Sequence, residues 1–99
     1  MEKMKKLKKV DPNVPRPFTE IADRIRWHRG LMGLNQVKYA KNIGHARSIY
    51  SLWESGTYRV SLDGALSLRK THGLSLDFIY EGNSDALSIT LRQAWNDRS

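Results

Sequence analysis

Glycines divide most of this chain into short segments, and their spacing constrains the fold more than any other feature. Five of the seven glycines have this spacing: Gly33, Gly44, Gly56, Gly73 and Gly82. Between them, apolar residues recur at intervals of three and four, as they do along one face of a helix. No segment alternates apolar and polar residues in the manner of a half-buried strand. Because glycine commonly follows the last turn of a helix, the sequence predicts an all-α bundle of short helices from Phe18 onward.

Capping residues mark where these helices begin. The side-chain oxygen of a capping residue accepts a hydrogen bond from an N–H group of the first turn. Residues of this kind precede four of the segments: Thr19, Asn35, Ser61 and Ser75. The first helix is expected to close at Gly30 and Gly33. Further helices are expected over residues 36–42, about 47–55, 62–72, 76–81 and about 85–97.

A single small core is expected, because 99 residues form one domain and bury a limited area. The residues predicted to face this core share a helical spacing. They are Ile21, Ala22, Ile25, Leu31 or Met32, Val37, Tyr39, Ala40, Ile43, Leu62, Ala65, Leu68, His72, Leu87, Leu91, Ala94 and Trp95.

The net charge of +7 points to a polyanionic partner, either nucleic acid or an acidic membrane face. Residues 24–73 carry nine Lys and Arg against Glu54 and Asp63, a net of +7, whereas residues 74–99 carry a net of −2. Residues 1–17 are Lys-rich and contain three prolines, which predicts a flexible basic arm.

Several other classes of function are disfavoured. Cysteine is absent, which excludes disulfides, thiolate zinc sites and a cysteine nucleophile. The spacing of His28, His45 and His72 does not suit a metal site, so we interpret them as packing residues. No nucleophile motif or phosphate-binding glycine loop is present. We expect no enzyme activity, no cofactor and no metal. With no apolar run of membrane-spanning length and no secretory signal at residues 1–10, a cytoplasmic location is expected.

Two short helices joined at Gly44 are expected within residues 34–56, whose sequence is LNQVKYAKNIGHARSIYSLWESG. Ala40 is small enough to let the helices cross closely, and Tyr50 and Trp53 can anchor the second helix to the core. The outward residues would then be Arg47, Ser48, Ser51 and Leu52. This layout is typical of a helix-turn-helix that reads DNA through the major groove, where arginine bonds guanine and serine bonds several bases.

The chain resembles the helix-turn-helix family of the lambda repressor and Cro type. The resemblance covers about residues 19–82 and rests on an ordered set of matches. They are Ile21, Arg24, Ile25 and Arg26; Leu34 to Gln36; Ala40, Gly44, Arg47 and Ser48; Trp53 to Gly56; Ser61, Leu62 and Leu68; and Gly73 to Asp77.

The resemblance implies roles for particular residues. Arg47, Ser48 and Leu52 match base-reading positions, with Ile49 and Ser51 beside them. Ile49 is placed to pack on a thymine methyl group. The positions expected to contact DNA phosphates are Gln36, Lys38, Thr57, Tyr58 and Arg59. The predicted organisation is an arm over residues 1–17, a DNA-binding domain over 18–82 and a C-terminal helix within 83–99.

The sequence departs from the family pattern in four ways. Ala46 stands where the family usually has a capping Ser or Thr, which costs about 1 kcal/mol of capping. Lys38 replaces a frequent Glu and so removes a capping box. Histidines occupy positions that are commonly apolar, and Val60 replaces a frequent proline.

The predicted function is sequence-specific binding of double-stranded DNA by a bacterial or phage-encoded transcriptional repressor. A palindromic operator requires a homodimer, and the helix over 85–97 is the first candidate interface; alternatively, its stripe covers the domain's own core. The sequence does not decide whether Trp27 is exposed beside the basic first helix or packed in the core. Two other hypotheses are an antitoxin that holds a toxin partner with this helix and a membrane-surface role for the arm.

Overall fold

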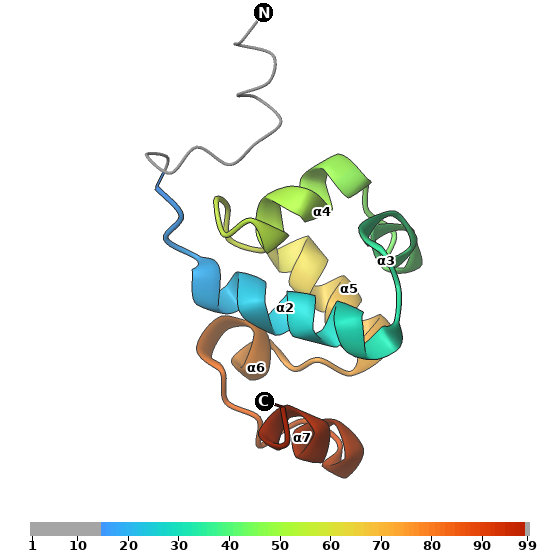
Figure 1. Cartoon of the computed structure of the whole chain (residues 1–99), viewed down its shortest axis with the longest axis vertical. Helices are drawn as coiled ribbons and strands as arrows, with labels where there is room; N and C mark the ends of the chain where they lie inside the picture. The colour runs from blue at the N-terminus through green and yellow to red at the C-terminus, as the bar shows by residue number, and fades with distance from the viewer. Residues whose placement is uncertain (1–14, 99) are drawn as a thin grey trace, which may run out of the picture.

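The computed structural model describes residues 15–98, and this part of the chain contains α-helices and no strand. The helices are α2 (Thr19–Met32), α3 (Gln36–Asn42), α4 (Arg47–Glu54), α5 (Leu62–His72), α6 (Leu76–Glu81) and α7 (Ile89–Asn96) (Figure 1). The all-α prediction is therefore confirmed. The predicted basic arm lies outside the described residues except for residues 15–17.

Three of the predicted capping residues act as caps. The side chains of Asn35, Ser61 and Ser75 each accept a hydrogen bond from the third helical residue that follows. These bonds satisfy N–H groups that have no partner within the helix. They explain why α3, α5 and α6 begin where the sequence predicts.

The start of α2 corrects one prediction, because Thr19 lies inside the helix and does not cap it. The capping position is Phe18, which makes no side-chain capping bond. Its backbone N–H instead donates to the carbonyl oxygen of Gly56 at 3.0 Å, and its carbonyl accepts from Ala22. A tertiary contact with the segment after α4 thus sets this helix start. Gly30 also lies within α2, which continues to Met32.

The last helix begins at Ile89, so the predicted start near Asp85 is wrong. Asn83 accepts a hydrogen bond from the Asp85 N–H through its side chain, and Leu87 N–H donates to the carbonyl of Ser84. These bonds form a turn that buries Leu87. Ser88 then caps α7 by accepting from the N–H of Leu91 at 3.2 Å.

The core lies where α2, α3, α4, α5 and α6 meet. α4 packs on α2 and α3, and α6 packs on α2 and α5. Fully buried side chains at the centre include Ile25, Tyr39, Leu68 and Phe78. Some expected core residues are not in it: Val37 is 57% exposed, Leu62 is 61% exposed, and Leu31 and Met32 are 50% and 47% exposed. All of them occupy the first or last turn of a helix, where the helical spacing leaves the inner face poorly defined.

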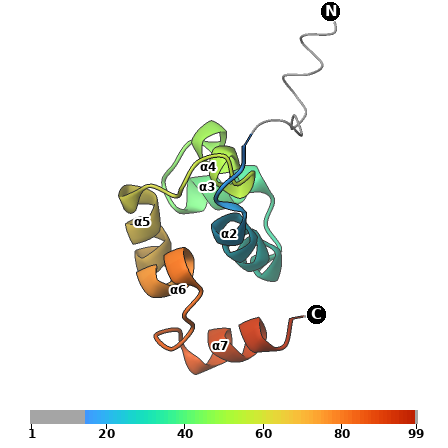
Figure 2. The ribbon, with the colours of Figure 1, turned by 90° about the vertical axis from the view of Figure 1, so that its left-hand side faces the viewer.

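An aromatic cluster joins α7 to the rest of the domain. The ring of Trp95 packs edge-on against Trp27 of α2 at 5.0 Å and against Phe78 of α6 at 4.9 Å. Trp27 is therefore a packing residue, and the stripe on the last helix covers the domain's own core. Viewed from two directions, α7 lies at the opposite end of the domain from α3 and α4 (Figures 1 and 2).

Candidate nucleic-acid interface

The turn between α3 and α4 requires glycine at one position. Gly44 has a φ of 78°, a left-handed conformation that is strained in residues with a side chain. Its N–H donates to the carbonyl of Lys41, and the N–H of His45 donates to that of Ala40. Ala40 is buried at the crossing of the two helices, as its small size predicts. The turn and the close crossing fix the angle at which α4 leaves α3.

The inner side of α4 is anchored by two aromatic residues. Tyr50 and Trp53 are buried, as the sequence predicts. Tyr50 packs against Tyr39 of α3 with 5.4 Å between ring centroids. The indole of Trp53 lies close to α5 at Gly64, where an added Cβ would come within 2.3 Å of the indole Cη2 atom. Only glycine lets α5 approach the indole this closely.

The buried carboxylate of Glu54, on the inner side of α4, connects α4 to α2 and α3. Glu54 accepts hydrogen bonds from Arg29 Nε of α2 at 2.6 Å and from Gln36 Nε2 of α3 at 2.9 Å. It also accepts from the hydroxyl of Tyr50 on α4 itself. The sequence does not predict this role for Glu54, which enters only the charge balance of residues 24–73 and the Trp53–Gly56 match. An acidic residue at the end of an otherwise apolar inner face was the available signal for such a network.

The hydrogen bonds keep this carboxylate charged. Burial alone would raise the pKa of Glu54, but the bonds from Arg29, Tyr50 and Gln36 outweigh burial and hold the pKa below its ordinary value. The hydrogen bond to Glu54 in turn raises the pKa of Arg29. Burial, aided by the same carboxylate, raises the pKa of Tyr50. The network therefore stays as a charged pair with a neutral phenol.

The outer side of α4 is open to solvent at its N-terminal end. Arg47 and Ser48 are exposed, and Ile49 is 46% exposed. Ser51 and Leu52 are half-buried, and the Ser51 hydroxyl donates to the carbonyl of Ser48 at 3.1 Å. No side chain caps this helix at Ala46, as the departure from the family pattern predicts.

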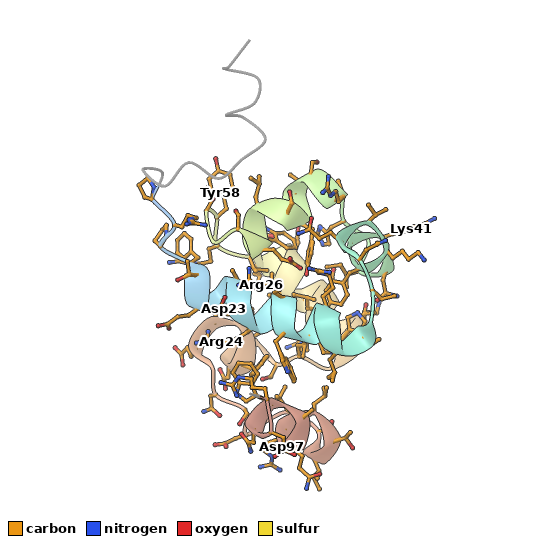
Figure 3. All side chains as sticks on the ribbon, in the orientation of Figure 1. Asp23, Arg24, Arg26, Lys41, Tyr58 and Asp97 are labelled. Carbon is orange, nitrogen blue, oxygen red and sulfur yellow. The ribbon has the colours of Figure 1, made fainter. Side chains whose placement is uncertain are left out.

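The residues expected to contact phosphates lie in two segments. Gln36 is half-buried and held by Glu54, whereas Lys38 is exposed on α3. Thr57, Tyr58 and Arg59 lie in the loop after α4. Figure 3 shows Tyr58 projecting from that loop and Lys41 projecting outward from α3. Lys41 was not among the expected contacts, although its exposed position on α3 is comparable to that of Lys38.

The loop after α4 is fixed at both ends. The hydroxyl of Ser55 donates to the side-chain oxygen of Thr57 at 2.9 Å. The guanidinium of Arg59 lies over the ring of Phe18, 4.8 Å from its centroid. Together with the backbone bond from Phe18 to Gly56, this contact places Phe18 beside the loop.

The histidines have packing roles, as predicted. His28 of α2 is buried, and its Nδ1 lies 2.6 Å from the hydroxyl of Tyr39. His72 of α5 stacks on the ring of Tyr39 at 5.1 Å. His45 lies edge-on to Trp53 at 5.3 Å. No group of three potential metal ligands occurs among residues 15–98. Over the same range, no helix is both long enough and apolar enough to cross a bilayer.

Comparison with known proteins identifies this arrangement. A family model described as helix-turn-helix matches residues 25–79, from the middle of α2 into α6. A search of curated proteins found no match, and neither did a search of solved structures. The matched range contains the α3–α4 pair, the Glu54 network and the exposed outer side of α4. This chain therefore belongs to the DNA-binding helix-turn-helix family of the lambda repressor type.

Proposed function

We propose that this protein binds double-stranded DNA sequence-specifically and inserts the N-terminal half of α4 into the major groove. The observation that carries the proposal is the contrast between the two sides of α4. Its inner side is locked by Tyr50, Trp53 and Glu54, while Arg47 and Ser48 stand in solvent. A rigid helix that presents a guanidinium and a hydroxyl has the groups needed to bond base edges.

Within this proposal, Arg47, Ser48 and Ile49 make the main base contacts. Ser51 and Leu52 contribute less, because both are half-buried and the Ser51 hydroxyl is bonded to the helix backbone. Lys38, Tyr58 and Arg59 contact phosphates from the two segments that flank α4. Gln36 and Thr57 support them from half-buried positions. Phosphate contacts position the protein, and base contacts select the sequence.

We infer a repressor that acts as a homodimer on a palindromic operator. A two-fold operator requires two copies related by the same symmetry. Trp95 already packs on its own domain, so any contact that α7 makes with a second copy would use the outer residue Ile89, which is 67% exposed. The same packing weakens the antitoxin alternative, because the largest apolar side chain of α7 is not free to hold a toxin.

The test is selection of bound sequences from random duplexes, with the wild type and Arg47→Ala. Loss of a bidentate contact is expected to relax the preference at one base pair of each half-site and to weaken binding by about 1–3 kcal/mol. Arg69→Ala is the matched control, because it removes the same charge from an exposed position in the last turn of α5. Sizing of the complex by light scattering gives the number of copies bound.

The control variant is expected to bind more weakly without any change in the selected sequence. An Arg47→Ala protein that selects the wild-type sequence with wild-type affinity would show that α4 does not read bases. A bound species containing one copy would contradict the homodimer.

A further inference from the structure

Ile49 is an apolar side chain on a surface otherwise suited to polar contacts. It lies in the first turn of α4, next to the exposed Ser48 and one turn before Leu52. Nearly half of its surface is open to solvent. Because residues three apart on a helix are neighbours, Ile49 and Leu52 form a small apolar area beside the polar groups of Arg47 and Ser48.

We propose that Ile49 reads the 5-methyl group of a pyrimidine, and that operator binding therefore responds to methylation at that carbon. This inference rests on the proposed function, since it assigns one ligand group to the outer side of α4. In the major groove, the 5-methyl of thymine is an apolar group that protein side chains can contact. It has the size and chemistry that complement an exposed isoleucine between hydrogen-bonding neighbours.

The side chain of Ile49 is well prepared for such a contact. A β-branched residue in a helix has one strongly preferred χ1 rotamer, so little conformational freedom is lost when it meets a ligand. The helix beneath it is fixed by Trp53 and Glu54. Ser51, which follows Ile49 closely in the sequence, has turned its hydroxyl toward the Ser48 carbonyl. These features place a rigid methyl-bearing surface beside the polar groups that read bases.

The same contact is available on 5-methylcytosine as on thymine. Both bases carry the methyl on the same ring carbon, whereas uracil and cytosine lack it. A side chain that contacts only the methyl does not distinguish the two methylated bases. At the position that faces Ile49, methylation of a cytosine should therefore strengthen binding by the same factor as replacing uracil with thymine.

The experiment measures equilibrium binding of the full chain to the selected operator at fixed salt. Each thymine of one half-site is replaced in turn by deoxyuridine, in the matching position of both half-sites. One position is expected to lose about fourfold in affinity per half-site, the equivalent of roughly 0.8 kcal/mol for one methyl group removed from water. At that position, 5-methylcytosine should bind about fourfold more tightly than cytosine per half-site.

Variants of Ile49 assign the effect to this residue. Ile49→Ala should bind thymine and uracil operators equally, and cytosine and 5-methylcytosine operators equally. Ile49→Val, which keeps a branched apolar surface, should retain most of both differences. Leu31→Ala is the matched control, because Leu31 is also about half exposed but lies in the last turn of α2. This control should retain both differences in full.

Two results would overturn the inference. One is an operator in which no thymine-to-uracil change affects the wild type. The other is a methyl effect of the same size in the wild type and in Ile49→Ala. If Arg47→Ala still alters the selected sequence in either case, the proposed function stands and only the assignment of Ile49 fails. If the protein selects no sequence at all, both proposals fail together.

Discussion

Glu54 shows how one buried residue can govern the geometry of a binding surface that it never touches. The carboxylate is 4% exposed and receives hydrogen bonds from Arg29, Gln36 and Tyr50. A buried ion pair adds little net stability, because the desolvation of both charges offsets their attraction. Its value here is positional. It fixes α2, α3 and α4 at the level of the C-terminal end of α4, and the other end of that helix then projects outward.

His28 makes the stability of the fold depend on pH. Burial, together with the nearby His72, lowers the pKa of His28 to about 4. Because the unfolded chain takes up this proton near pH 6.5 and the folded chain does not, stability falls as the pH drops from 6.5 to 4. The loss from His28 reaches roughly 3 kcal/mol when the transition is complete. Burial also lowers the pKa of His72, which adds a loss of the same sign.

Urea unfolding at a series of pH values measures this dependence. His28→Gln cannot take up a proton in this range, so its stability should fall less steeply between pH 6.5 and 4 than that of the wild type. The amide can still bond the hydroxyl of Tyr39, which keeps the comparison close. Equal slopes for the two proteins would show that His28 is not responsible.

At the level of elements, helix ends were predictable where the signal was local. Asn35, Ser61 and Ser75 cap the helices that follow them, and Gly33, Gly73 and Gly82 adopt the left-handed conformation after helix ends. Each of these bonds or conformations involves residues within a few positions of one another, so the sequence alone determines it. The helix-turn-helix pair and the buried side of α4 were predictable for the same reason.

Features that depend on distant segments were not predictable in this way. The start of α2 is set by a hydrogen bond from Phe18 to Gly56, and Glu54 meets an arginine that lies on another helix. α7 begins later than the predicted start near Asp85, because residues 83–87 form a turn that buries Leu87 and Ser88 then caps the helix. In each case a contact with a distant segment determines where a helix begins or which residue a side chain bonds, and the local sequence does not specify that contact.

Two glycines inside helices test this distinction between local and tertiary effects. Gly30 of α2 has open space around it, whereas a Cβ at Gly64 of α5 would collide with the ring of Trp53. Gly30→Ala should stabilise the protein by up to about 1 kcal/mol through helix propensity. Gly64→Ala should destabilise it by about 1–3 kcal/mol, because Trp53 must move from a close-packed site.

Thermal and urea unfolding of both variants measure the two changes in stability. Gly64→Ala should also weaken operator binding, since Trp53 anchors α4 to the core. If both substitutions stabilised the protein by similar amounts, the close approach of α5 to the indole would be wrong.

Across the molecule, the net charge differs between the α3–α4 region and the C-terminal helices. The proposed DNA-contacting segments of α3, α4 and the loop after it carry Lys38, Lys41, Arg47 and Arg59. Residues 74–99, which include α6 and α7, have a net charge of −2. α7 lies at the opposite end of the domain from α3 and α4 (Figure 2). Such a separation orients the protein as it approaches a polyanion, with α3 and α4 foremost.

If the protein approaches DNA in this orientation, the position of a positive charge should affect the salt dependence of binding more than the total charge does. Lys38→Ala and Lys70→Ala each remove one positive charge, the first from α3 and the second from the last turn of α5. Both change the long-range field by one charge. If Lys38 contacts a phosphate, only its removal releases one counterion fewer on binding, and the slope of log affinity against log salt concentration flattens by about 0.9 per copy. Titrations of one duplex over a range of salt measure both slopes.

Because phosphate contacts carry no sequence information, Lys38→Ala should weaken binding to selected and random duplexes by the same factor. Equal slopes for the two variants would mean that net charge, rather than a contact from α3, sets the electrostatic part of binding.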